Sequence, residues 1–113
     1  MVKTKIAVFI SGGGTNLQAL IDAQRDGILR NGRIVLVISS NSIAYGLKRA
    51  REAGIDAVAV TRRDSGSQEA FEAEILEKLE EYGIELIVLA GFLNIGYVRL
   101  DGTCMLNTPR GIM

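Results

Sequence analysis

Three consecutive glycines stand between an apolar segment and a segment of helical period, and their chemistry suits a phosphate. An apolar run rich in β-branched residues, 6–10, precedes them, and an apolar stripe begins at Leu17. Glycines let a ligand approach the backbone closely. The start of a helix adds unpaired N–H groups and the positive end of the helix dipole. We therefore predict a phosphate-binding loop formed by Gly12, Gly13, Gly14, Thr15 and Asn16.

The same loop also has a purely structural interpretation. The glycines could make a tight turn, while Thr15 caps the following helix and Gln18, three residues later, caps it reciprocally. This capping is compatible with phosphate binding. A dinucleotide-binding oxidoreductase is disfavoured, because the third glycine of that fingerprint would fall at Leu17 and the second apolar run leads to Asn41 rather than to a carboxylate. A nucleoside triphosphate loop would need a Gly-Lys-Ser/Thr sequence, which the chain lacks.

Further candidate residues lie in the last quarter of the chain. Residues 90–96 place apolar side chains beside two glycines, which suits a pocket wall but also an ordinary strand end. Asn107 could donate a hydrogen bond to a developing oxyanion, although an Asn close to Pro109 is also typical of a turn. Cys104 has no basic partner and is expected to be inert. The chain contains no histidine, the usual general base near neutral pH.

The elements that must position these residues follow from the hydrophobic pattern. Near-continuous apolar runs at residues 6–10, 34–38, 57–60 and 86–89 predict a parallel sheet buried on both faces. Three apolar stripes of helical period alternate with them, and Gly27, Gly54 and Gly83 follow the stripes where a C-terminal glycine is expected. The stripes comprise Leu17, Leu20 and Ile21, then Ile43, Leu47 and Ala50, then Phe71, Ile75, Leu79 and Tyr82.

This alternation predicts an α/β fold, a Rossmann-like doubly wound parallel sheet with strand order 3-2-1-4. Ligands bind such sheets at the carboxyl ends of the strands, where the order reverses, here between the first and fourth strands. Residues 11–16 and 90–96 leave these two strands. The two loops are therefore expected to lie side by side.

Composition limits the remaining choices. A chain of 113 residues, 48% apolar and 23% charged, suits one globular domain. Basic and acidic residues number 13 each, so no net charge attracts nucleic acid or anionic lipid. No apolar window approaches the roughly 18–20 residues of a membrane span, and no export signal is expected. A single cysteine suits the reducing cytoplasm. We expect a cytoplasmic protein with no metal site.

Three segments together resemble phosphoribosylglycinamide formyltransferases in order and spacing, namely residues 10–19, 44–50 and 88–92, and the likeness extends over roughly residues 5–95. It implies transfer of a formyl group from 10-formyltetrahydrofolate to the amine of glycinamide ribonucleotide, in de novo purine biosynthesis. It also implies that residues matching Gly14, Thr15 and Asn16 bind the substrate phosphate. The folate-contacting segment of the family matches Leu93, Asn94, Ile95 and Gly96.

The sequence departs from the family pattern at several functional positions. Asn94 stands where the family usually has arginine, and Gln68 stands where some members have a second folate-contacting arginine. Gln68 could instead be the capping partner of Ser65. The family motif Asn-x-His-Pro appears as Asn-Thr-Pro from Asn107, so Asn107 is carried over as catalytic but the histidine is not. The later catalytic aspartate of the family would fall beyond residue 113.

These departures predict a truncated formyltransferase fold with little or no turnover. Residues 1–95 would form the α/β domain with its phosphate-binding loop, and residues 96–113 a divergent tail that could hold a fifth strand. The alternative is a non-catalytic phosphosugar-binding module. An exposed sheet edge could also pair two copies into a homodimer.

Overall fold

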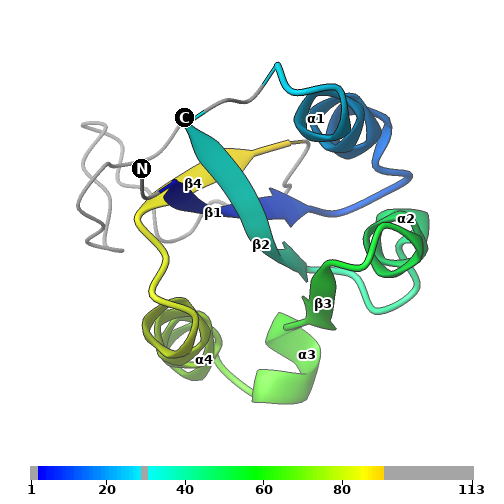
Figure 1. The fold of residues 1–113 in the computed structure, drawn as a ribbon. Helices are drawn as coiled ribbons and strands as arrows, with labels where there is room; N and C mark the ends of the chain where they lie inside the picture. Colours follow the sequence, from blue (N-terminus) through cyan, green and yellow to red (C-terminus); the bar gives the residue numbers. More distant parts are fainter. Residues whose placement is uncertain (1–2, 29–30, 91–113) are drawn as a thin grey trace.

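The computed structural model describes residues 3–28 and 31–90, which form a four-stranded parallel sheet with helices on both faces (Figure 1). The strand order is β3-β2-β1-β4, so the predicted fold class and strand order are confirmed. The elements in chain order are β1 (Thr4–Ile10), α1 (Thr15–Arg25), β2 (Gly32–Ser39), α2 (Tyr45–Glu52), β3 (Asp56–Ala59), α3 (Arg62–Ser65), α4 (Gln68–Glu81) and β4 (Leu86–Leu89).

Strand β1 is central and pairs in parallel with β2 on one side and with β4 on the other. Val8 illustrates the register, because it lies opposite Val37 of β2 and Val88 of β4. The chain moves outward from β1 to β3 and then returns to the far side of β1. This return creates the reversal of strand order at which ligands bind doubly wound sheets.

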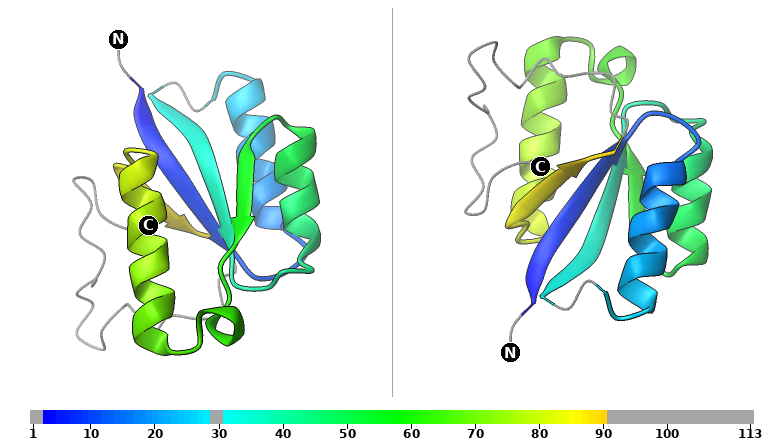
Figure 2. Two further views of the ribbon diagram at one scale, coloured as in Figure 1. Left: turned by 90° about the horizontal axis from the view of Figure 1, so that it is seen from below. Right: turned by 90° about the horizontal axis from the view of Figure 1, so that it is seen from above.

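Each face of the sheet packs against its own helices. Helices α1 and α2 cover one face and α4 covers the other (Figure 2). Successive side chains of a strand point to opposite faces. Thus Phe9 packs in the core with Phe71 of α4, whereas Val8 and Ile10 pack in the core with Leu17 of α1. This double burial explains why the strands are apolar without alternation.

The C-terminal glycines of the helices are confirmed. Gly27, Gly54 and Gly83 follow α1, α2 and α4 with φ angles of 79°, 75° and 64°, in the left-handed region that glycine adopts without a Cβ clash. Two members of the predicted stripes differ. Ile43 precedes α2 and is 86% exposed. Tyr82 caps the end of α4, half-buried, and its hydroxyl donates to the Asp56 carboxylate at 2.9 Å.

The predicted capping of α4 by Ser65 and Gln68 is wrong. The N-cap is Ser67, whose Oγ accepts from the Ala70 N–H at 3.1 Å. Ser65 ends the short helix α3, which the hydrophobic pattern did not reveal, and its hydroxyl donates to Glu74. Because α3 extends to Ser65, the N-cap of α4 lies two residues later in the chain than predicted.

Within residues 3–28 and 31–90, no helix combines the length and the apolar character that crossing a membrane requires.

The two serines before α4 provide a matched test of this cap. Ser67→Ala should lower the free energy of unfolding by about 1 kcal/mol, because it removes the side-chain oxygen that caps this helix. Ser65→Ala removes an exposed hydrogen bond to Glu74 and should cost less than about 0.5 kcal/mol. Urea unfolding of both variants measures the difference, and the reverse ranking would show that Ser65 is the cap.

Candidate functional site

The glycine-rich loop lies where the strand order reverses. It leaves the carboxyl end of β1 and leads directly into α1 (Figure 1). The chain after β2 lies beside it, because the Ser40 N–H donates to the Ile10 carbonyl at 3.1 Å. Ala90, the residue that follows β4, lies on the other side of β1, because its N–H donates to the Phe9 carbonyl at 2.9 Å. The start of the second predicted loop is therefore beside the first.

The start of α1 differs from the predicted capping box. Its N-cap is Gly14, at φ 78° and ψ 29°, and no side chain caps this helix. Thr15 is the first helical residue, and the Gln18 N–H donates to the Gly14 carbonyl at 2.8 Å. The reciprocal cap by Thr15 and Gln18 is therefore wrong, because Gly14 adopts the left-handed turn into the helix. Within the part of the chain that the structure describes, no N-cap side chain therefore accepts from the first-turn N–H groups.

Gly14 and Gly46 bring two backbones into direct contact. A Cβ at Gly14 would lie 2.7 Å from the Gly46 Cα, and one at Gly46 would collide with the Ile10 side chain and lie 3.3 Å from the Gly12 carbonyl oxygen. The Gly46 N–H donates to that same oxygen at 3.1 Å. The loop thus packs backbone to backbone on the first turn of α2.

Sequence reasoning did not assign a role to Gly46. A signal was present, because glycine is unfavourable within a helical stripe and usually has a packing reason there. The partner, however, lies more than thirty residues earlier in the chain, at Gly12 and Gly14.

Gly12 and Gly13 have no comparable structural reason to be glycine. Both are exposed, neither has a left-handed φ, and apart from the adjacent residues no atom of the described chain would lie within 4 Å of a Cβ at either position. Thr15 and Asn16 are exposed at the same helix start. The four residues thus form an accessible, unobstructed backbone surface of the kind that an anion approaches.

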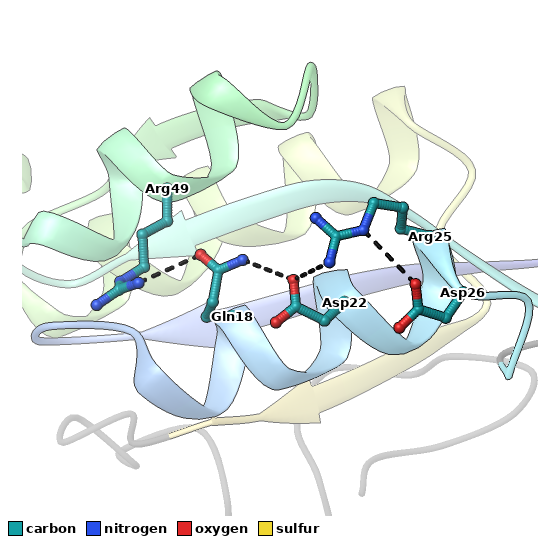
Figure 3. A network of polar contacts seen from close by, with 5 residues as sticks. All are labelled: Gln18, Asp22, Arg25, Asp26 and Arg49. Atoms are coloured by element: carbon teal, nitrogen blue, oxygen red, sulfur yellow. Dashed lines mark hydrogen bonds and ion pairs between the residues drawn. The ribbon is translucent and has the colours of Figure 1, made fainter.

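Arg49 of α2 connects this loop to a row of polar side chains along α1 (Figure 3). Its Nε donates to the Gly13 carbonyl at 2.8 Å, and its Nη1 donates to Gln18 Oε1 at 3.2 Å. Gln18 Nε2 in turn donates to Asp22 at 3.0 Å, and Asp22 lies 3.1 Å from Arg25. The loop and both helices on this face therefore share one hydrogen-bonded network.

A hollow between α1 and α2 is a different feature from the predicted site. It is lined by the flanks of the two helices, including Gln18, Gln24, Arg25 and Glu52, and by none of the loop residues. Its polar lining already has partners, since Gln18 bonds to Arg49 and Gln24 accepts from the Ile34 N–H at 2.6 Å. We therefore place the candidate site at the loop rather than in this hollow.

The other predicted site residues divide into two groups. Gln68 begins α4, on the opposite face of the sheet from α1, and its amide donates to Glu72 at 3.3 Å. The remaining predictions lie outside the described residues: the folate segment Leu93, Asn94, Ile95 and Gly96, the catalytic Asn107, the inert thiol of Cys104, the fifth strand and the boundary at residue 95.

The reversal point, the glycine-rich loop and the helix start without a side-chain cap define the chain as a Rossmann-like α/β domain with a candidate anion site. Comparison with known families makes the class more specific. Residues 4–98 match the formyl transferase family. The chain belongs to this family.

Individual relatives agree with this assignment. The chain is 44% identical over 96 residues to the trifunctional purine biosynthetic protein adenosine-3 of Drosophila melanogaster, covering 82% of this chain and 7% of that protein. It is 40% identical over 90 residues to the phosphoribosylglycinamide formyltransferase of Escherichia coli strain K12, covering 80% of this chain and 42% of that protein.

A solved structure is similar as well. The glycinamide ribonucleotide transformylase 1 of Symbiobacterium toebii superposes with a TM-score of 0.76 at 40% identity, covering 96% of this chain and 46% of that one. The chain thus spans less than half the length of each of these relatives.

The loop glycines should separate into two kinds on substitution. Gly14→Ala should lower the free energy of unfolding by at least about 2 kcal/mol, because alanine at φ 78° is strained and its methyl would meet the Gly46 backbone. Gly12→Ala and Gly13→Ala should leave stability unchanged or raise it by up to about 1 kcal/mol, because alanine restricts the unfolded chain. Urea unfolding measures the free energy of unfolding of each variant, and equal decreases in all three would contradict this distinction.

Proposed function

We propose that this chain is the substrate-phosphate-binding part of a phosphoribosylglycinamide formyltransferase of de novo purine biosynthesis. Its substrate is glycinamide ribonucleotide and its cosubstrate is 10-formyltetrahydrofolate. The names of the relatives support the proposed formyl transfer. The chemistry of the glycine-rich loop supports the proposed binding of the substrate phosphate. The observation that carries the proposal is the pair Gly12 and Gly13, whose glycine character nothing inside the described chain requires.

The loop offers a phosphate three kinds of contact. Backbone N–H groups at the start of α1 have no side-chain cap, and the helix dipole favours an anion there. Thr15 and Asn16 carry an exposed hydroxyl and an exposed amide at the same place. Gly12 and Gly13 allow a phosphate oxygen to approach the main chain without meeting a Cβ. Gly14 fixes the turn that presents these groups together.

Formyl transfer needs more than this anchor. The substrate amine attacks the formyl carbon, a tetrahedral oxyanion forms, and its collapse breaks the bond to the folate nitrogen while one proton leaves the amine and another reaches that nitrogen. We propose that Asn107 donates a hydrogen bond to the oxyanion. The 113-residue chain has no histidine for the proton transfers, and a positioned acid–base group contributes about 10²–10⁴-fold in rate. We therefore expect binding with little or no turnover.

The proposal extends to the folate and to the organisation of the chain. Leu93, Asn94, Ile95 and Gly96 would contact the folate, with Gln68 in place of a family arginine. We propose residues 1–95 as the family domain, and the family match over residues 4–98 supports that boundary. We also propose a cytoplasmic location, which the single Cys104 supports. Homodimer formation would use an edge strand of the described sheet, such as β3.

A second candidate function is a phosphosugar-binding module that performs no chemistry. The observation that favours it is the combination of an unobstructed glycine-rich loop with a chain that contains no histidine. The two functions share the phosphate site and differ in whether the loop serves formyl transfer.

Calorimetry should show that the phosphate dominates recognition. We expect the chain to bind glycinamide ribonucleotide at least about tenfold more tightly than the dephosphorylated ribonucleoside, because charge-assisted hydrogen bonds to the phosphate are lost. Gly13→Ala should weaken nucleotide binding by about tenfold, since its methyl would occupy the path of the ligand. The ribonucleoside is the matched control ligand, and no binding at millimolar nucleotide would overturn both candidate functions.

A mixing assay distinguishes the enzyme from the binding module. The chain alone should transfer formyl groups slowly or not at all. Mixed with the part of the Escherichia coli relative that it does not cover, it should gain measurable activity, and the same mixture made with Gly13→Ala should show a higher KM for the nucleotide. A mixture that stays inactive, although the chain binds the nucleotide, would favour the non-catalytic module.

A further inference from the structure

Arg49 is placed to control the shape of the glycine-rich loop. It lies on α2, yet its guanidinium donates to the Gly13 carbonyl through Nε. Through Nη1 it also donates to the Gln18 side chain of α1 (Figure 3). The guanidinium is planar and its donors form a fixed fork, so two contacts in different directions define its orientation. The Tyr45 ring adds a third contact, with its centroid 4.9 Å from Arg49 Cζ. Arg49 is therefore a braced donor rather than a freely rotating cation.

Two successive carbonyls of the loop are held from the same helix. The Gly46 N–H of α2 donates to the Gly12 carbonyl at 3.1 Å, and Arg49 Nε donates to the Gly13 carbonyl at 2.8 Å. The described chain contains no cis peptide bond. In a trans peptide the carbonyl and the following N–H point in opposite directions. Holding these two carbonyls toward α2 therefore directs the N–H groups of Gly13 and Gly14 away from α2.

We propose that Arg49 is a positioning residue of the phosphate site, which fixes the peptide plane between Gly13 and Gly14 and so aims the Gly14 N–H at the substrate phosphate. The inference rests on the proposed function, because it assumes that the phosphate binds at this loop. It goes beyond that function by assigning the geometry of the loop to one side chain of a different helix. Arg49 acts through the main chain and need not touch the ligand.

Arg49 could act on the phosphate site through its positive charge or through its orientation of the loop, and these two effects can be separated. Among residues 3–28 and 31–90 its side chain forms no ion pair, so its positive charge is not neutralised by a carboxylate. A charge effect alone would survive replacement by lysine. A positioning effect would not, because a single ammonium group lacks the fork that spans Gly13 and Gln18.

The test compares Arg49→Lys and Arg49→Gln with Arg51→Gln. Arg51 lies on the same helix, but its guanidinium donates to the carbonyl of Ala57 in β3, at 3.4 Å, and not to the loop. Arg51→Gln is therefore a matched control. Calorimetry measures affinity for glycinamide ribonucleotide and for its dephosphorylated ribonucleoside, and thermal unfolding reports on the fold. Both Arg49 variants should bind the nucleotide about tenfold more weakly, with unchanged ribonucleoside affinity. They should still unfold cooperatively, at a somewhat lower temperature because the two Arg49 hydrogen bonds are lost. Arg51→Gln should match the wild type.

Each other result has a defined meaning. If the wild-type chain does not bind the nucleotide, the proposed function fails and this inference fails with it. If the wild type binds and Arg49→Gln binds as tightly as Arg51→Gln, only the inference fails. Wild-type affinity in Arg49→Lys would show that charge rather than orientation matters, and would also overturn it.

A second variant covers the case in which the Arg49 variants do not fold. Gln18→Met retains a side chain of similar length but removes the acceptor for Arg49 Nη1, while leaving the contact with Gly13. It should weaken nucleotide binding by about threefold with little change in ribonucleoside affinity. Wild-type nucleotide affinity in this folded variant would overturn the positioning role.

Discussion

The backbone of the glycine-rich loop packs directly on the backbone of α2, and the candidate site depends on this contact. A side chain at Gly14 or Gly46 would separate the two segments, because a Cβ at either position would overlap neighbouring atoms. The hydrogen bond from Gly46 to Gly12 holds the loop at this distance. Because it lacks a Cβ, Gly14 can both approach α2 this closely and adopt the left-handed turn from which α1 begins. The position of the start of α1 relative to α2 follows from this close approach.

The sheet supplies the framework for that contact. Strands β1 and β2 lie side by side in parallel, so the loops at their carboxyl ends lead into two adjacent helices on the same face. Buried strands cannot shift without exposing residues such as Val8 or Phe9 on one face or the other. The site therefore inherits its rigidity from cores on both sides.

Binding an anion and transferring protons require different kinds of polar group. The described part of the loop offers hydrogen-bond donors, a helix dipole and a nearby guanidinium, all suited to holding a charged group. Proton transfer demands a titratable group near neutral pH, and the chain has no histidine. The chain belongs to the formyl transferase family, and the physical character of the loop suits the anchoring role that we propose for it.

The sequence alone determined the strands, their order, the C-terminal glycines of the helices and the position of the glycine-rich loop. These features depend on local periodicity and on residues such as Gly27 whose conformational freedom is intrinsic. Only the tertiary structure decided that Gly14 rather than Thr15 caps α1, that Gly46 meets the loop, and that Arg49 holds the Gly13 carbonyl from a position 36 residues away. No periodic pattern encodes such contacts, because they arise when two helices that follow different strands pack on one face of a sheet.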